Sequence, residues 1–514
     1  MLFRLAHAQA EIIHIIIYHL PMDDLTNRKI IAERIEKQQP IKLSFRYVNE
    51  KVLMVLNSIV ARILAHQDQV FLLNSTITIL REIIINALKA NAKRIFFIKN
   101  QLDINNNAAY MSGMNKFKKE VIGEFESVEE DLKRSDFYVH ITFQHDDKSI
   151  RIMVENNSPI LPVELERINF RIEKALKYND FSEAYAEIED DSEGAGLGIV
   201  LTILLLKNMG IDPKNYHISN EGKNTRTSLS IPAVLQPGEI TTKVKTKILN
   251  EIDGIPTFPE NIVQLQRLCS DPESSIDQIV KRLKLDPALS TDVIKLSNSA
   301  GIAPHKHIED IKTAVVTIGM KNLNAILVAS NARRILNERY TSFELIWEHC
   351  NRVAFYARNI ALSLRQTAII ENVYMAGLLH DLGKIILLAT DKKLVRKIAE
   401  IVNNRKITTT TMEEISIGIS HSAIGSLIAQ RWNFPDYLIE AIAYHHSPLN
   451  GSEKYRDIVF TIYLANMMAG IEDRRYTNYY IEETVLERCG LLDLNKFKSF
   501  HDRLKAKYDS TKRL

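Results

Sequence analysis

The stretch 377–384, GLLHDLGK, places an adjacent histidine and aspartate, His380 and Asp381, within a strongly apolar helical segment. From about residue 240 onward, apolar residues recur with helical spacing, and no stretch shows convincing strand alternation. A buried polar pair needs hydrogen-bond partners or an ion. The sequence therefore predicts an all-α C-terminal half whose core contains polar side chains.

Further histidines fall on other predicted helices of this half. His349 shares a helical stripe with Val353 and is expected to face the core. His421 is expected on the helix predicted to begin at Thr411, and the pair His445 and His446 follows in AIAYHHSP. Facing helices of a bundle can build a metal site from inward-pointing side chains. These segments are therefore candidates for one shared site.

Imidazole nitrogens together with a carboxylate suit a divalent metal such as Mn, Fe or Zn. The other interpretation is that each histidine is a hydrogen-bonded core residue. The candidate metal ligands are His349, His380, Asp381, His421, His445 and His446.

The N-terminal half mixes strand and helix patterns. Residues 137–145 and 149–156 alternate apolar and polar side chains and predict a β-hairpin. Residues 227–232 and 94–99 (RIFFIK) are also predicted to be strands. Long helices are predicted over 49–66 and 74–92, and residues 1–39 have helical spacing. This half is therefore predicted to be a mixed α/β unit.

Two local signals mark ends of elements. Pro237-Gly238, in a polar stretch, predicts the boundary between the two halves. In the C-terminal half, Thr411 and Glu414 have the spacing of a capping box, which predicts a helix start at Thr411.

Two features of the N-terminal half could bind phosphates. Glu82 and Asn86 are spaced i,i+4 and are followed by Lys89, so a carboxylate and an amide could meet a metal-bound triphosphate from one helix face. A glycine loop before an apolar helix could cradle phosphates with its backbone. The other interpretations are a polar edge on an amphipathic helix and a tight turn. The loop glycines are Gly194, Gly196 and Gly198.

The order of three segments resembles the histidine-kinase-type (GHKL, or Bergerat) ATPase superfamily over about residues 40–235. The segments are REIIINALKANAKR (81–94), MVENNSPILP (153–162) and the glycine loop. The resemblance implies an α/β sandwich that binds ATP with Mg²⁺. The alternative is a scaffold that binds no nucleotide.

This resemblance also implies roles for individual residues. Asn86 would coordinate Mg²⁺, Glu82 would stand where hydrolysing members keep a water-polarising acid, and the loop glycines would cradle the phosphates. Asn156 stands where the superfamily keeps an adenine-binding aspartate, and the two glycines that follow that aspartate are replaced. Kinase activity is not expected, because the preceding histidines lack the His-Glu or His-Asp context of a phosphoacceptor. These are His7, His14, His19 and His66.

The C-terminal half resembles the HD superfamily and, more closely, its HDOD branch. Residues 252–301, which begin IDGIPTFPEN, carry the resemblance together with AVVTIGMKNLNAIL (314–327) and RWNFPDYLIEAIAYHH (431–446). It covers about residues 245–505. It implies an all-α fold with a signalling or regulatory role and no demonstrated catalysis.

The resemblance to metal-dependent HD phosphohydrolases implies that His349, His380 and Asp381 hold a first metal. They also need a late aspartate, at whose position this sequence has Asn466. The GYP motif of cyclic-di-GMP phosphodiesterases is absent after the double histidine. Some members hold a second metal with the residues that correspond to His421, His445 and His446.

Composition excludes several classes of protein. The 514 residues include only 18 glycines and 14 prolines, as in helix-rich proteins. The net charge of +3 is too small to drive binding to nucleic acid, and three cysteines suit reduced thiols in a cytoplasm. No apolar stretch reaches the roughly 20 residues of a membrane span. We expect a cytoplasmic protein without membrane or direct nucleic-acid binding.

Together these observations predict a helical segment over 1–39, an ATPase-like domain over 40–235, a linker over 236–244 and an HDOD domain over 245–505. The predicted function is signal transduction, in which a nucleotide-binding module is coupled to an HDOD output that acts by contacts with other signalling proteins. A homodimer is compatible with this prediction. The alternative is a metal-dependent phosphohydrolase of a nucleotide or cyclic dinucleotide.

Overall fold

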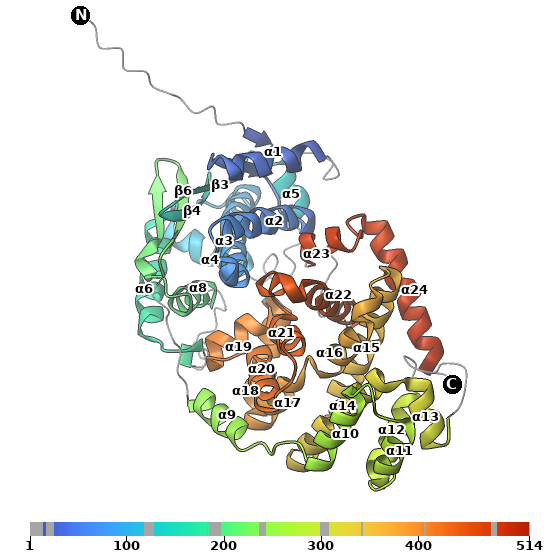
Figure 1. Ribbon diagram of the computed structural model, residues 1–514. Helices are drawn as coiled ribbons and strands as arrows, with labels where there is room; N and C mark the ends of the chain where they lie inside the picture. The colour runs from blue at the N-terminus through green and yellow to red at the C-terminus, as the bar shows by residue number, and fades with distance from the viewer. Residues whose placement is uncertain are drawn as a thin grey trace, which may run out of the picture. The chain divides into compact units, whose positions relative to one another are not determined.

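A computed structural model describes most of the chain as two compact units, Met1–Ile240 and Thr241–Leu514 (Figure 1). Each unit has its own apolar core. The described residues are 14–16, 25–117, 128–181, 183–184, 197–235, 243–298, 308–340, 343–405, 408–473 and 481–512. The predicted boundary at 237–238 lies outside them.

The first unit contains a six-stranded sheet in the order β1-β2-β3-β4-β6-β5. β1 runs parallel to β2, and the other neighbours are antiparallel. The predicted hairpin is present as β3 and β4, whose turn is closed by Asp146 Oδ1 accepting hydrogen bonds from the amides of Lys148 and Ser149. The strands are β1 His14–Ile16, β2 Ile41–Phe45, β3 Val139–Asp146, β4 Ser149–Asn156, β5 Tyr216–Glu221 and β6 Asn224–Pro232.

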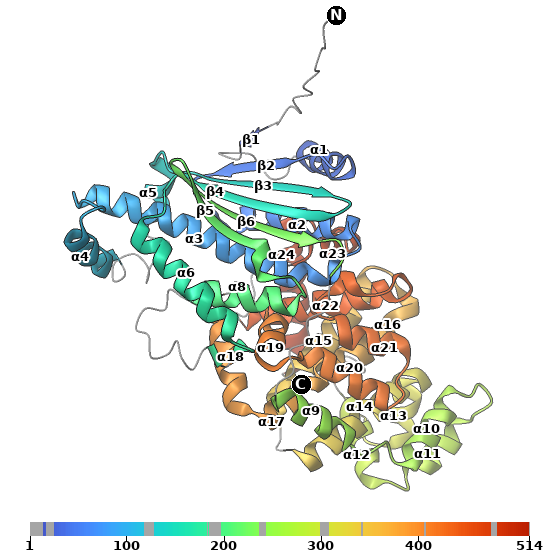
Figure 2. The ribbon, with the colours of Figure 1, turned by 90° about the vertical axis from the view of Figure 1, so that its left-hand side faces the viewer.

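Helices cover one face of this sheet. Alternate side chains of β3 and β4 are buried, and Figure 2 shows α2, α3 and α8 against the same face. α8 is buried along nearly its whole length, so its uniformly apolar sequence fits a core helix. The helices of this unit are α1 Leu25–Glu36, α2 Glu50–His66, α3 Leu73–Lys99, α4 Asn107–Phe117, α5 Glu129–Arg134, α6 Pro162–Lys177 and α8 Leu197–Asn208, with 3₁₀ turns η1 Val70–Leu72 and η4 Pro213–Asn215.

Two sequence predictions for this unit are wrong. Residues 94–99 are not a strand but the last turns of α3. Phe96 packs on Phe117 with ring centroids 5.5 Å apart and Phe97 packs on Tyr110 at 6.0 Å, so packing on α4 outweighs the strand propensity of the run. The segment 1–39 is not purely helical either, because His14–Ile16 pairs with β2.

The second unit is all-α among its described residues. One cluster of apolar side chains joins α10 to α14, and a second bundle is formed by α15, α16, α17, α20, α21 and α22. The helices are α9 Lys243–Asp253, α10 Glu260–Ser270, α11 Ile276–Leu283, α12 Pro287–Ser297, α13 Ile311–Ile318, α14 Met320–Arg339, α15 Glu344–Ser363, α16 Ile370–Leu379, α17 Leu382–Thr390, α18 Lys392–Arg405, α19 Thr409–Ile417, α20 His421–Arg431, α21 Asp436–Tyr444, α22 Arg456–Glu472, α23 Glu483–Arg488 and α24 Leu494–Lys512, with 3₁₀ turns η5 Thr367–Ile369, η6 Pro448–Asn450 and η7 Glu453–Tyr455.

The predicted cap at Thr411 is wrong. α19 begins at Thr409 with Thr408 as its N-cap, and Thr411 is buried in the first turn. The two hydroxyls lie 2.6 Å apart, so the side chain of Thr411 bonds Thr408 and not Glu414. His421 is accordingly not on this helix but is the first residue of α20.

Two glycines let the helices of the bundle approach closely. A Cβ at Gly377 on α16 would lie 2.4 Å from Cα of Ala354 on α15. A Cβ at Gly383 on α17 would lie 1.9 Å from the carbonyl oxygen of His421. Close contact between α17 and α20 therefore depends on glycine, and it brings Asp381 beside His421.

Two helical stretches, Val70–Lys99 and Thr367–Thr390, are long and apolar enough to span a membrane by length and composition. Within their most apolar windows, 61% and 78% of the residues are buried inside the protein. Both stretches thus have the burial expected of core helices.

Candidate functional site

The six predicted metal ligands converge in the second unit. His349 comes from α15, His380 and Asp381 from the junction of α16 and α17, and His421 from the first residue of α20. The remaining two follow the C-terminus of α21. They form two groups, and Asp381 belongs to both. Within each group, the possible ligand atoms all lie within 4.8 Å of one another. One group is His349, His380 and Asp381, and the other is Asp381, His421, His445 and His446.

Hydrogen bonds fix the tautomers of three of these rings. His380 Nδ1 lies 2.9 Å from the carbonyl oxygen of Gly377, and His445 Nδ1 lies 2.7 Å from that of Ile442. His421 Nδ1 lies 2.7 Å from Oε2 of Glu413, which also accepts from the backbone amide of His421 at 2.8 Å. Because oxygen acceptors cannot donate, each Nδ1 carries the proton and each neutral ring keeps its lone pair on Nε2.

The Nε2 atoms of His421 and His445 lie close to Asp381 and to each other. His421 Nε2 lies 3.4 Å and His445 Nε2 lies 3.5 Å from Asp381 Oδ1, and the two Nε2 atoms are 3.2 Å apart. Buried acceptors that face one another without a donor repel unless a cation lies among them. Among the described residues, Asp381 Oδ1, His380 Nε2 and His446 Nε2 are buried and have no hydrogen-bond partner. The residues present therefore fit a metal ion.

The charges in the cluster agree with this fit. Burial lowers the pKa of His380 to about 3 and also lowers the pKa of His445 and His446, so these rings are neutral at pH 7. Burial alone would raise the pKa of Asp381, but Lys384 and the neighbouring histidines together outweigh it and hold the pKa well below its usual range. Neutral imidazoles and a carboxylate are the forms that bind metals.

Asn466, on α22, lies beside the first group. Its Oδ1 is 3.0 Å from His349 Nε2, and its buried Nδ2 has no hydrogen-bond partner among the described residues. This position thus supplies a neutral amide, which is a weaker ligand than a carboxylate for a hard divalent cation.

Sequence reasoning missed two residues of this cluster. Lys384 donates to Asp381 Oδ2 at 2.7 Å, and its place three residues after Asp381 on a helix was a usable signal. Glu413 orients His421 from a different helix, and the local sequence contains no signal for that contact.

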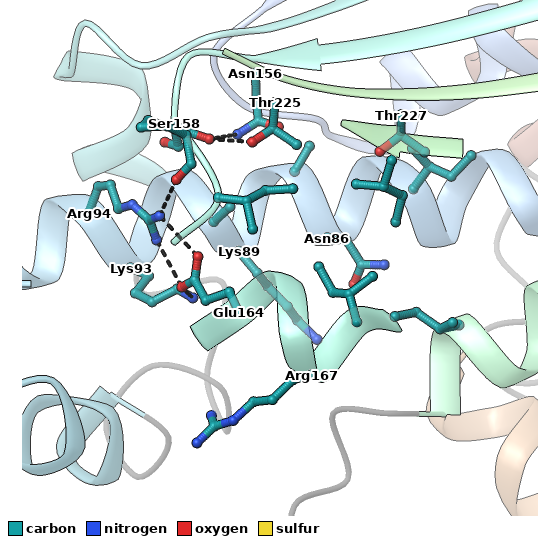
Figure 3. A pocket seen from close by; sticks show the side chains of 18 of the residues that line it. Asn86, Lys89, Lys93, Arg94, Asn156, Ser158, Glu164, Arg167, Thr225 and Thr227 are labelled. Carbon is teal, nitrogen blue, oxygen red and sulfur yellow. Dashed lines mark hydrogen bonds and ion pairs between the residues drawn. The ribbon is translucent and has the colours of Figure 1, made fainter. Parts of the chain in front are cut away.

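A second candidate site is a cavity of about 240 Å³ in the first unit. It lies between α3, the ends of β4 and β6, and α6 (Figure 3). Asn86 and Lys89 of α3 line it, as does Asn156 at the end of β4. Apolar walls with a few polar groups are typical of small-molecule sites.

The structure separates the other residues predicted for this site. Glu82, one turn before Asn86, is buried and is not among the described residues that line the cavity. Gly198 is buried in the first turn of α8, next to the cavity residue Ile199. Gly194 and Gly196 lie outside the described residues.

The orientation of Asn156 is fixed by a buried network. Its Nδ2 donates to Asn91 Oδ1 at 3.2 Å, and Ser158 Oγ donates to the same oxygen at 2.7 Å. Asn91 Nδ2 in turn donates to the carbonyl of Tyr138 at 3.1 Å. Because its amide nitrogen is bound in this way, Asn156 keeps its carbonyl oxygen as an acceptor for a ligand. The sequence contained no signal for Asn91, which is fully buried.

One end of the cavity carries a largely buried ion cluster. Arg94 binds Glu164 through two parallel contacts of 3.2 and 3.1 Å, and Lys93 also contacts this carboxylate. The same carboxylate accepts from Tyr110 at 3.3 Å and from the amide of Leu161, before α6, at 3.0 Å. Burial opposes ionisation, but Lys93 and Arg94 outweigh it and lower the pKa of Glu164 to about 2.

Comparisons with known proteins agree with the architecture of the second unit. The HDOD domain family matches residues 255–448. An uncharacterized protein of Treponema pallidum (strain Nichols) is 31% identical over 454 residues, which cover 88% of each chain. The chain therefore carries an HDOD domain of the HD superfamily and belongs to one family with this relative.

Two solved structures are also similar to part of the chain. An HDOD domain protein of unknown function from Geobacter sulfurreducens is 24% identical, with a TM-score of 0.43, over 52% of this chain and 94% of its own. A Shewanella amazonensis protein, described provisionally as a phosphohydrolase, is 23% identical, with a TM-score of 0.42, over 51% of this chain and 95% of its own.

Proposed function

We propose that this protein is a cytoplasmic signalling regulator. A nucleotide-binding, GHKL-like unit controls an HDOD unit, which acts by contacts with other signalling proteins and holds a divalent metal. The observation that carries the regulatory role is Asn466, a neutral amide beside His349 at the position where metal-dependent HD phosphohydrolases keep an aspartate. The low net charge of +3 argues against direct nucleic-acid binding.

The cavity of the first unit supports ATP with Mg²⁺ as the signal. Its wall offers an amide at Asn86, which can coordinate a cation, and the carbonyl oxygen of Asn156, which can accept from the amino group of adenine. Thr225 and Thr227 add hydroxyls along the same wall (Figure 3).

Binding of ATP is tested by thermal unfolding. Millimolar ATP with Mg²⁺ is expected to raise the melting temperature of the full chain, because a ligand that binds only the folded state stabilises it. Asn86→Ala and Asn156→Leu should abolish the shift. Lys214→Ala, an exposed lysine outside the cavity wall, should keep it. A wild-type protein that shows no shift would exclude ATP as the ligand.

The alternative function is a metal-dependent phosphohydrolase. It is favoured by the acceptor cluster around Asp381 and by Lys384, whose ammonium group could meet a phosphate. We expect no hydrolysis of bis(p-nitrophenyl) phosphate by the wild type with Mn²⁺ or Fe²⁺. Hydrolysis that Asp381→Ala removes would favour the enzyme over the regulator. Asn466→Asp, which restores an anionic ligand, is the variant in which hydrolysis is most to be expected.

A further inference from the structure

We propose that the histidine cluster binds a single metal ion, at Asp381 Oδ1 among His421, His445 and His446, and that the ammonium group of Lys384 takes the place of a second cation at Oδ2. This inference rests on the metal in the proposed function and states where that metal lies. The two oxygens of one carboxylate thus serve two different cations.

The two carboxylate oxygens of Asp381 have different partners. Oδ1 faces His421 and His445 and has no hydrogen-bond partner among the described residues. Oδ2 faces His349 at 3.7 Å and His380 at 3.5 Å, and accepts from Lys384 at 2.7 Å. A positive charge is therefore already present on the Oδ2 side only.

The ligand atoms on the Oδ1 side are spaced as a tetrahedral metal ion requires. Four ligands about 2.05 Å from a tetrahedral Zn²⁺ lie about 3.3 Å from one another. The three separations among Asp381 Oδ1, His421 Nε2 and His445 Nε2 are 3.4, 3.5 and 3.2 Å. These atoms are therefore spaced as three corners of such a tetrahedron. His446, whose buried Nε2 has no partner among the described residues, is available as the fourth.

The Oδ2 side is a poorer metal site. His349 Nε2 is engaged by Asn466 Oδ1 at 3.0 Å, closer than its 3.7 Å from Asp381 Oδ2. A cation here would need to displace Lys384 and would gain no anion from Asn466. In addition, two cations bound to the two oxygens of one carboxylate repel each other, which further disfavours a metal ion on the Oδ2 side.

The chemistry of the favoured side selects the metal. Three imidazoles and one carboxylate suit Zn²⁺ or Fe²⁺ better than Mg²⁺, which prefers oxygen ligands. Four protein ligands around Zn²⁺ form a closed site of the structural type, with no position kept for water. Such a centre stabilises the contact of α17, α20 and α21 and fits a regulatory protein.

The test is metal stoichiometry in the full-length protein after loading with Zn²⁺ and removal of free metal. The wild type should retain about one equivalent per chain. His446→Ala should lose it, and His349→Ala should keep it. Glu413→Gln, which leaves His421 in place but weakens its orientation, should lower the affinity at least about tenfold. Intrinsic tryptophan fluorescence checks that each variant is folded.

Two further readouts complete the test. Co²⁺ in the wild type should give the intense visible absorption of a four-coordinate ion, unchanged in His349→Ala. The double variant Lys384→Met with Asn466→Asp should bind a second equivalent, because it removes the competing ammonium and adds an anion.

Some outcomes would overturn the inference. An equivalent of metal that His349→Ala removes and His446→Ala leaves would place the ion at Oδ2, and two equivalents in the wild type would also contradict a single site. In both cases the proposed metal-binding function would stand. Absence of metal from the folded wild type would overturn both this inference and the metal of the proposed function, while the ATP shift would still test the rest.

Discussion

Replacing Gly383 with alanine is expected to destabilise the HDOD unit by about 3 kcal/mol or more. The added Cβ would lie 1.9 Å from the carbonyl oxygen of His421 and 2.6 Å from the amide nitrogen of Gly425. Both groups belong to the backbone of the first turns of α20, and backbone atoms cannot rotate away as a side chain can. α20 must therefore shift as a whole, and His421 with it.

Urea unfolding monitored by tryptophan fluorescence measures this change. Both tryptophans of the chain, Trp347 and Trp432, are buried in the second unit and report on it alone. Gly254→Ala is the control, since the nearest atom to its Cβ is the end of the flexible Arg339 side chain, at 2.8 Å. The control should stay within about 0.5 kcal/mol of the wild type. Equal effects of the two variants would contradict the close packing of α17 on α20.

Glu164→Ala is expected to destabilise the first unit by about 3–5 kcal/mol, because it leaves two largely buried cations without their anion. The side chains of Lys93, Arg94 and Glu164 are 15%, 9% and 13% exposed. The loss should appear in urea unfolding by far-UV circular dichroism, while the tryptophan transition stays unchanged. Glu130→Ala removes two exposed ion pairs on α5, with Lys133 and Arg134, and should change stability by less than about 1 kcal/mol.

This effect should depend on pH in one direction. The pKa of Glu164 is lowered in the folded state from its ordinary value of 4.5 to about 2. Its stabilising contribution is therefore complete above about pH 4.5 and is lost as the pH falls toward 2. The difference between wild type and Glu164→Ala should shrink over that range. A difference that is constant from pH 7 to pH 3 would mean that the ion cluster does not stabilise the unit.

Periodicity was sufficient to predict those elements whose burial follows their own sequence. The hairpin of β3 and β4 alternates buried residues with less buried ones, and α2 begins directly after its N-cap Asn49, so both were predictable. Residues 94–99 were not, because neighbours from α4 decide their conformation. β5 escaped prediction since it is a polar strand at the edge of the sheet.

The sites show the same difference between local and distant contacts. The histidines and Asp381 were predictable as a group, because polar side chains in apolar helices stand out in a sequence. The different surroundings of the two Asp381 oxygens were not predictable, because they depend on contacts of Lys384, Asn466 and Glu413 that only the fold creates. In the cavity, Asn91 determines how Asn156 is presented, and it looks like any other polar residue of a long helix.

Glu164 makes the length of α6 depend on the charge at the cavity wall. One carboxylate both caps the amide of Leu161 at the start of the helix and neutralises Lys93 and Arg94 on α3. An incoming anion that captured those two cations would release the carboxylate, and the first helical turn would lose its cap and fray. Binding of the anion would then shorten α6 by one turn, about 5 Å. A change in the ion pairs of Glu164 would thus move the backbone at the start of α6.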